Sequence, residues 1–237
     1  MNKYILADMA TERLMRETSM TAKSLPDQIK TLEADLPKGK MRFETELYQS
    51  EKLKKITIGR RSLGDASAGT VVMLMSQDEY DFPFVLADIA FEPAGKEGLI
   101  AAGFQLRPVV NDAESMKKYI DPFQAWYKAI DSHPSEPIYL DIGGYLKSHP
   151  APLNYAGKIP CDYSDDVLKL TEQFFDILLD IYHRAEPVTD VQRRKQMDDF
   201  RADYNRNILG DDYSGKVLIK TFGLETTKLF YDYLVYL

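Results

Sequence analysis

Short segments with a strand-like pattern follow one another through the first half of the chain. Apolar and polar residues alternate over 41–49 and 52–61, and 70–76, 82–91 and 98–110 are short runs dominated by apolar residues. Such segments are typical of β-strands. Because the connections between them are too short for helical crossovers, we expect four or five consecutive strands to form an antiparallel sheet.

Helical patterns precede and follow these strands in the sequence. Residues 4–19 and 25–35 contain helix formers with a loose 3.6-residue periodicity. After the strands, residues 112–130 are also expected to be helical, with a break or kink at Pro122. The sheet is therefore expected to have helices to pack against it.

A mixed segment separates this helix from the C-terminal part of the chain. Residues 137–146 resemble one more strand, and the Pro- and Gly-rich residues 149–160 are expected to form a loop. Ser164 has the position of an N-cap before a strongly amphipathic helix. From this residue onward the pattern is helical.

Three further helices are expected before the last residue. Thr189 and Gln192 have the spacing of a capping box, residues 213–222 end at the helix-terminating Gly223, and 225–236 carry the last apolar face.

The order of elements predicts the fold class. Strands come first and helices mostly follow, and no stretch has the composition of a linker, a repeat or a low-complexity segment. We therefore expect a single α+β domain over 1–237, with a central antiparallel sheet flanked by helices and a mostly helical C-terminal half.

Composition limits the functions that this fold could carry. The single cysteine, Cys161, cannot form an internal disulfide, which is typical of a cytoplasmic protein. No signal sequence begins the chain, and no run approaches the ~18 apolar residues of a membrane helix. The net charge of −7 argues against nucleic acid as a partner. We expect no membrane and no nucleic-acid association.

The common cofactor and metal motifs are not found. Neither a dinucleotide fingerprint nor a P-loop occurs, and His133, His149 and His183 are scattered without metal-ligand spacing. An enzyme with this sequence is expected to bind no metal and no cofactor, and to use carboxylates as its acid–base groups.

One carboxylate has an unusual position. Asp88 is the only polar residue in the apolar run 82–91, so it lies on an apolar face in either strand register. Two interpretations are open. Asp88 could be satisfied by the backbone or by an arginine in an ordinary ion pair. Alternatively, burial could raise its pKa and make it a proton donor.

Two motifs in this order resemble the ferredoxin-dependent bilin reductases. The segment "EYDFPFVLADIAFEPAGKEGLIAAGFQLRP" carries Tyr80, Pro83, Asp88 and Pro108 in the places that the central hairpin of that family uses. The segment "VTDVQRRKQMDDFRADYNRNILGDDYSGKVLIKTFG" resembles the late helices of the family, and its best local match is to the phycoerythrobilin-forming members.

The resemblance implies a fold, a substrate and an electron donor. The fold would be a three-layer α/β/α sandwich, with a biliverdin-like linear tetrapyrrole between the sheet and the C-terminal helices. Single electrons would come from reduced [2Fe–2S] ferredoxin through a substrate radical, without a bound cofactor. The two catalytic carboxylates of the family fall on Asp88 and Asp212, with Asp211 next to the second.

The resemblance also implies binding residues and shows departures. Gly59 and Val71 stand where phycocyanobilin-forming members have a Glu and a His, so reduction at the A-ring is favoured over the D-ring vinyl group. A propionate-binding Arg of the family falls near His149. We assign substrate binding to four residues, His149, Lys147, Arg107 and Val71.

Ferredoxin is acidic, so docking on this acidic chain requires a local basic face. Lys52, Lys54, Lys55 and Arg60 are expected to supply it. The alternative is that these residues only solvate an edge strand.

Two other functions compete with bilin reduction. A carrier that binds bilin without catalysis would explain the lost polar groups at 59 and 71. A reductase of another open-chain tetrapyrrole, such as a chlorophyll or haem catabolite, would have the same fold.

Overall fold

A central antiparallel sheet organises the chain in the computed structural model, which describes residues 4–37, 39–92 and 98–237. Within these residues nine strands pair in the order β1-β3-β4-β5-β6-β7-β9-β8, and β2 also pairs with β3. The strands are β1 Thr21–Lys23, β2 Thr31–Leu36, β3 Gly39–Gln49, β4 Leu53–Leu63, β5 Ser67–Ser76, β6 Phe84–Glu92, β7 Leu99–Arg107, β8 Glu136–Pro137 and β9 Leu153–Pro160. The five predicted strands therefore form the centre of the sheet.

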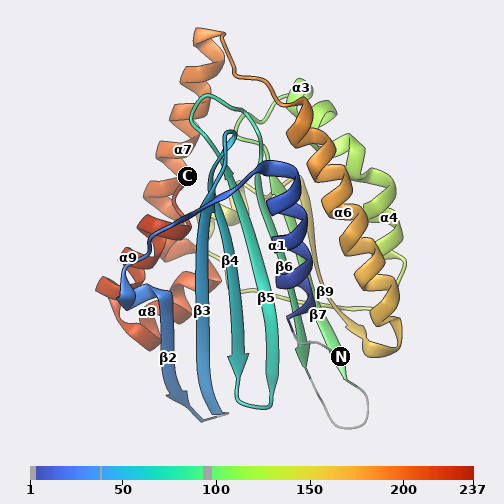
Figure 1. Cartoon of the computed structure of the whole chain (residues 1–237), viewed down its shortest axis with the longest axis vertical. Coiled ribbons are helices and arrows are strands. Elements are labelled where there is room, and N and C mark those ends of the chain that lie inside the picture. The colour runs from blue at the N-terminus through green and yellow to red at the C-terminus, as the bar shows by residue number, and fades with distance from the viewer. Residues whose placement is uncertain (1–3, 38, 93–97) are drawn as a thin grey trace.

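Helices cover both faces of this sheet, as Figure 1 shows. One layer contains α1, α4 and α6, and the other contains α7, α8 and α9. The helices are α1 Ile5–Thr18, α2 Asp27–Lys30, α3 Ala113–Ser115, α4 Gln124–Asp131, α5 Gly144–Ser148, α6 Ser164–Arg184, α7 Val191–Asp211, α8 Tyr213–Phe222 and α9 Leu224–Leu234. This arrangement confirms the α+β class and the three-layer sandwich.

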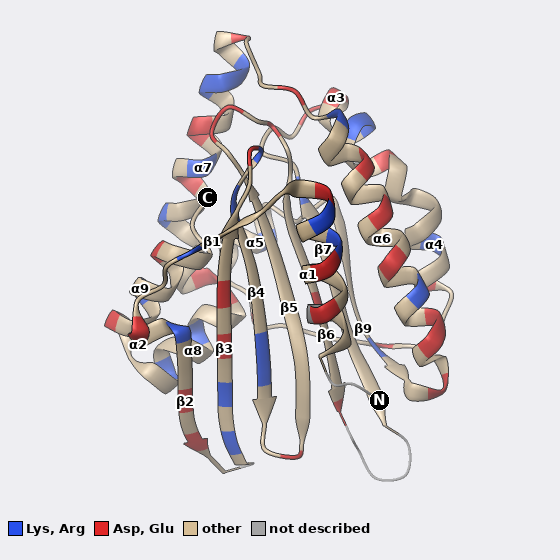
Figure 2. Cartoon of the chain, in the orientation of Figure 1, with Lys and Arg blue, Asp and Glu red and all other residues tan. Residues whose placement is uncertain are grey.

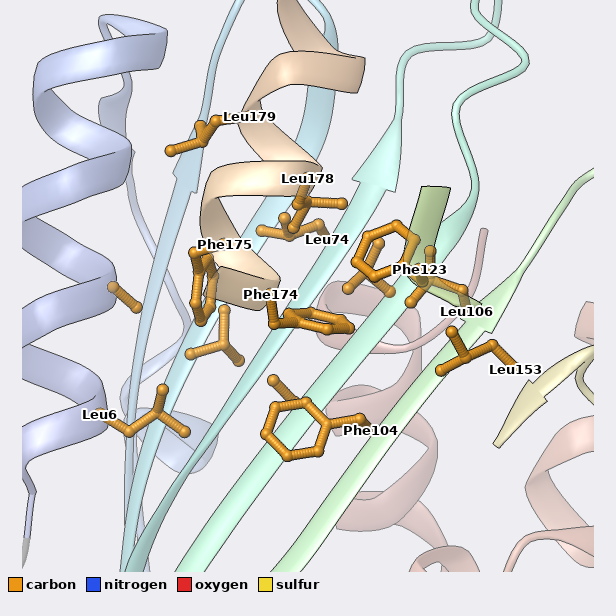
Figure 3. Close-up of a cluster of buried hydrophobic side chains, with 14 of the residues drawn as sticks. Leu6, Leu74, Phe104, Leu106, Phe123, Leu153, Phe174, Phe175, Leu178 and Leu179 are labelled. Carbon is orange, nitrogen blue, oxygen red and sulfur yellow. The ribbon is translucent and has the colours of Figure 1, made fainter. Parts of the chain in front are cut away.

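The larger core lies between the sheet and α4 and α6. Phe104 of β7 meets Phe174 of α6 and Trp126 of α4, with ring centroids 5.0 Å apart in both pairs. Phe123 packs on Phe174 at the same centroid distance, and Figure 3 shows the rings of Phe104, Phe123 and Phe174 among the leucines of the cluster. Aromatic pairs in such tilted arrangements add to the free energy gained by burial. This layer therefore holds the sheet rigidly from one side.

The second core is smaller and covers only part of the opposite face. Met73 and Phe84 of the sheet pack with Tyr204 of α7 and with Phe230 and Leu234 of α9. Further along the same face, side chains of β6 and β7 are only half-buried. The sheet thus leaves a partly open area on the side of the C-terminal helices.

Two predicted elements are wrong in type. Residues 25–35 are helical only over Asp27–Lys30, because Thr31–Leu36 pairs with the edge of β3. The predicted loop 149–160 contains strand β9, which pairs with β7. Its alternate residues are buried, and this alternation outweighs the Pro and Gly content that indicated a loop.

The predicted strand 137–146 is also wrong over most of its length. Only Glu136–Pro137 pairs with β9, and Gly144–Ser148 forms the short helix α5. The chain has to leave the sheet edge here to reach α7, where Gly143 N donates to Asp211 O at 2.8 Å.

Helix boundaries differ from the predictions by one residue at two caps. Tyr163, not Ser164, precedes the first residue of α6, and no side chain caps it. Asp190, not Thr189, caps α7 by accepting a hydrogen bond from Arg193 N at 2.7 Å. The predicted end of α8 is confirmed, because Gly223 follows it with a φ of 83°, a backbone conformation that favours glycine.

The break at Pro122 is confirmed as well. A π-helical turn over Met116–Ile120 leads into a 3₁₀ turn over Asp121–Phe123, and α4 follows. The tighter turn accommodates Pro122, which lacks a backbone N–H.

Truncation of Phe174 tests the larger core. We expect Phe174→Ala to lower the free energy of unfolding by about 3–5 kcal/mol, because it leaves a cavity among three aromatic rings. Urea denaturation followed by circular dichroism measures the change. The control Lys169→Ala removes a side chain on the same helix that is 70% exposed, and it should change stability by less than about 0.5 kcal/mol. Equal effects of the two substitutions would contradict this role of the aromatic cluster.

Candidate active site

Asp88 lies in the middle of β6 on the face that looks toward α7–α9. It pairs with Val71 of β5 on one side and with Gly103 of β7 on the other, and Val71 pairs with Gly59 of β4. The Asp88 side chain is 27% exposed. Because Gly103 has no side chain, one edge of the carboxylate stays uncovered. Asp88 is therefore a half-buried acid beside the open area of the sheet.

Arg61 is the ionic partner of this carboxylate. Its Nη2 donates to Asp88 Oδ1 at 2.8 Å. Burial raises the pKa of Asp88, and the positive charge of Arg61 opposes that rise. Burial removes water from the carboxylate and so favours the neutral acid, and this effect is larger than the opposing effect of Arg61. Asp88 thus has an arginine partner, and it binds its proton more tightly than an ordinary aspartate, while its role as a proton donor stays a prediction.

The second predicted carboxylate, Asp212, caps α8. Its Oδ2 accepts hydrogen bonds from Gly215 N at 3.3 Å and from the hydroxyl of Tyr231 at 2.6 Å. The neighbouring Asp211 accepts from Leu146 N at 2.6 Å and so caps the short α5. Among the described residues, no hydrogen bond or ion pair joins Asp88 to Asp212. Asp212 belongs to the helical layer opposite the sheet.

Arg107 is a buried cation at the other end of this face. It pairs in register with Phe84 and is 5% exposed. Its Nη1 donates to the backbone oxygen of His149, and its Nε has no partner among the described residues. Burial lowers the pKa of Arg107, which the nearby Tyr204 and Tyr145 partly offset. The described residues place no carboxylate in an ion pair with this guanidinium.

The structure brings His149 to Arg107 through its backbone rather than its ring. The imidazole stacks on Tyr145 at a centroid distance of 4.7 Å, and its Nδ1 lies 3.0 Å from Ser148 Oγ. Lys147 lies on the same short helix with an exposed side chain. Of the four predicted binding residues, Val71 therefore lies beside Asp88, while Arg107 and His149 form a second group.

The four predicted docking residues do not gather in one patch. Lys52 donates to three backbone oxygens at the end of α6, and Lys54 pairs with Asp78. Lys55 is 8% exposed and donates to the backbone oxygens of Asp232 and Tyr236. Arg60 lies roughly 20 Å further along the strand from Lys54.

Basic residues are instead distributed over the molecule, as Figure 2 shows on both helical layers and on the sheet. Lys55 in particular anchors the end of α9 to the sheet, so its charge is not available to a partner. The remaining three residues are docking candidates without a common surface.

Sequence reasoning missed two residues of the site. Arg61 has no predicted role from the sequence, although it follows Gly59 by two positions and so shares its face of the strand. The register of β4 with β5 and β6 is needed to see that it reaches Asp88. No sequence pattern indicates Tyr231 as a site residue, because its hydrogen bond to Asp212 joins two separate helices.

Comparisons with known proteins identify the family of the chain. The family model described as ferredoxin-dependent bilin reductase matches residues 7–235. The chain therefore belongs to the ferredoxin-dependent bilin reductases, oxidoreductases that take their electrons from ferredoxin.

Solved structures also resemble the chain. One of them is the crystal structure of phytochromobilin synthase from tomato in complex with biliverdin, with a TM-score of 0.75 and 14% sequence identity over 94% of this chain and 79% of that chain. At this identity the likeness shows the fold. A comparison with curated protein sequences finds no match.

In the part of the chain that the structure describes, no helix is both long and apolar enough to cross a membrane. In the same ranges, no three His, Cys, Asp or Glu side chains are grouped so that they could hold a metal ion.

The buried Lys55 predicts a pH dependence of stability. Burial lowers its pKa from 10.5 to about 8. Between pH 8 and 10 the unfolded chain therefore binds a proton that the folded chain has lost, so this group makes unfolding less favourable as pH rises. Relative to Lys55→Met, the wild-type chain should gain roughly 1 kcal/mol per pH unit in this window. Urea unfolding at pH 7.5, 8.5 and 9.5 measures the difference.

Lys169 supplies the control. Its side chain on α6 is 70% exposed and does not act on the pKa of Lys55, so Lys169→Met should follow the wild-type pH dependence. If the free energies of unfolding of the wild type and of Lys55→Met change in parallel with pH, Lys55 has the same pKa in the folded and the unfolded chain, and the prediction is wrong.

Proposed function

We propose that the chain reduces a linear tetrapyrrole, biliverdin or a dihydrobiliverdin, by single electrons from reduced ferredoxin. The observation that carries this proposal is the half-buried Asp88, whose pKa is raised on the sheet face that looks toward the C-terminal helices. Membership of the bilin reductase family supports the substrate class. The fold is also that of a phytochromobilin synthase whose structure was solved with biliverdin.

The proposed chemistry is the addition of two electrons and two protons to one double bond. A first electron from ferredoxin forms a bilin radical anion, and the carboxylic acid of Asp88 protonates it. A second electron and a second proton then complete the reduced bond, and solvent returns the proton to Asp88. We propose Asp212, which is held at the start of α8, as the source of the second proton. The protein itself provides orientation and protons.

The surroundings of Asp88 support reduction at the A-ring. Its neighbour Val71 and the next residue in the row, Gly59, cannot donate protons. A substrate lying over this row would meet one acid on the sheet. The D-ring vinyl reduction of the phycocyanobilin-forming members would require a second polar group beside Asp88. That reaction is therefore disfavoured here.

Arg107 supports binding of a substrate carboxylate. A guanidinium that is 5% exposed and has no acidic partner in the described residues favours an anionic ligand. Linear tetrapyrroles of this class carry two propionates. We propose that one of them pairs with Arg107 beside Tyr204 and Tyr145, with His149 and Lys147 at the rim.

A bilin carrier without catalysis is the second candidate. The ion pair between Arg61 and Asp88 favours it, because a carboxylate held by arginine loses part of its tendency to bind a proton. Apolar Val71 and Gly59 beside it agree with a binding role.

Turnover distinguishes the two candidates. Anaerobic incubation with biliverdin or 15,16-dihydrobiliverdin, reduced ferredoxin and an NADPH-regenerating system should shift the absorption spectrum of the bilin. Asp88→Asn should bind bilin normally and lower the rate at least 100-fold, because the amide cannot supply the proton. Tight binding without a spectral change in the wild type would establish the carrier, and full activity of Asp88→Asn would remove Asp88 from the mechanism.

The role of Arg107 is tested by binding. We expect Arg107→Gln to weaken biliverdin binding about 10- to 100-fold, since a charge-assisted hydrogen bond is lost. Fluorescence titration measures the dissociation constant. Biliverdin dimethyl ester should bind the wild type as weakly as biliverdin binds the variant. Lys169→Gln, which removes a charge that is 70% exposed on α6 in the other helical layer, is the control, and equal binding of the acid and the ester by the wild type would contradict the proposal.

A further inference from the structure

Arg61 reaches Asp88 across an intervening strand. The sheet order is β4-β5-β6, and Arg61 of β4 pairs in register with Gly69 of β5. A Cβ on Gly69 would lie 2.4 Å from the backbone oxygen of Ile89 and 2.5 Å from Ala90 Cα. Glycine at this position lets β6 approach closely and leaves the path of the arginine side chain free.

Position 59, where the phycocyanobilin-forming relatives have an acidic residue, is closed by packing. A Cβ on Gly59 would lie 2.6 Å from Phe43 Cζ and 2.9 Å from Val71 Cγ1. The ring of Phe43 on β3 therefore occupies the space that a polar side chain would need. The ionic partner of Asp88 comes instead from two residues further along β4.

Among the residues that the structure describes, no other charged side chain of the sheet pairs with Asp88. The facing residues of β5 and β7, Val71 and Gly103, are uncharged, and Arg61 is the charged group that acts on the pKa of Asp88. Further along this face, Glu92 of β6 and Lys158 of β9 pair with each other at 2.7 Å.

Four titratable groups of the described helical layer contact partners other than Asp88. Asp212 and Tyr231 bond to each other, and Tyr204 and Tyr145 lie near Arg107.

We propose that Arg61 is a positioning residue that orients the Asp88 carboxyl group and stabilises its ionised form after it has given its proton to the substrate. This inference rests on the proposed function, in which Asp88 gives a proton to the bilin. The Arg61 side chain is 41% exposed, so solvent can reach the pair and return the proton. Arg61 then sets the pH above which the acid form of Asp88 is lost and turnover declines.

Arg61→Gln and Arg61→Lys test this assignment, with Arg60→Gln as the matched control. Arg60 lies one residue away on the opposite face of β4, where it pairs with Glu46 at 3.1 Å and Asp8 at 3.7 Å. Arg60→Gln therefore removes the same charge from the same strand without touching Asp88. Asp88→Asn identifies the Asp88 signal in NMR spectra of the chain labelled with ¹³C at aspartate carboxyl groups.

We expect Arg61→Gln to raise the pKa of Asp88 by about one unit or more, because an opposite charge at ion-pair distance is removed. The pKa of Asp88 in Arg61→Lys should remain closer to that of the wild type, and the Asp88 titration of Arg60→Gln should equal that of the wild type. The alkaline limb of the pH–kcat profile should move upward by the same amount in Arg61→Gln. Identical Asp88 titrations in Arg61→Gln and Arg60→Gln would overturn the proposal.

The two readouts separate this proposal from the proposed function. The NMR titration needs no turnover, so a shift in Arg61→Gln together with an inactive wild type refutes bilin reduction and leaves the control of Asp88 by Arg61 intact. An active wild type without such a shift refutes the role of Arg61 alone.

Discussion

The burial of a carboxylate in an apolar sheet is the constraint on which the site depends. Asp88 is surrounded by strands whose side chains are mostly apolar, and an unpaired charge there would be costly. Arg61 compensates part of this cost across a glycine, while Gly103 leaves one edge of the acid open. The outcome is an acid that has a partner and yet retains its proton more readily than an ordinary aspartate.

A second aspartate seven residues earlier shows how much the surroundings decide. Asp81 is 3% exposed, more deeply buried than Asp88. However, it accepts hydrogen bonds from the hydroxyl of Tyr119, from Lys118 at 3.0 Å and from Arg193 at 2.9 Å, and these bonds lower its pKa despite its burial. Asp81 thus joins α7 to the segment before β6. The same residue type provides a structural ion pair at one position and a candidate proton donor at the other.

The two helical layers cover the sheet to different extents. The aromatic core under α4 and α6 fixes the sheet, so that the row through Val71, Asp88 and Gly103 is rigid. The layer of α7, α8 and α9 covers the opposite face incompletely. Arg201 anchors α7 by donating to the backbone oxygens of Asp78 and Tyr80, which places Tyr204 near Arg107. A substrate site can form where this second layer leaves the sheet uncovered.

The sequence by itself determined the central strands, the C-terminal helices, the family resemblance and the unusual position of Asp88, because these depend on local periodicity and on residues close in the chain. It misjudged β9, whose pairing with distant β7 outweighs its Pro and Gly content. Only the tertiary structure decided that Arg61 reaches Asp88, that Phe43 closes position 59, and that Lys55 is an internal anchor. The physical reason is that each of these contacts depends on strand register or helix docking, which bring together side chains that no local pattern connects.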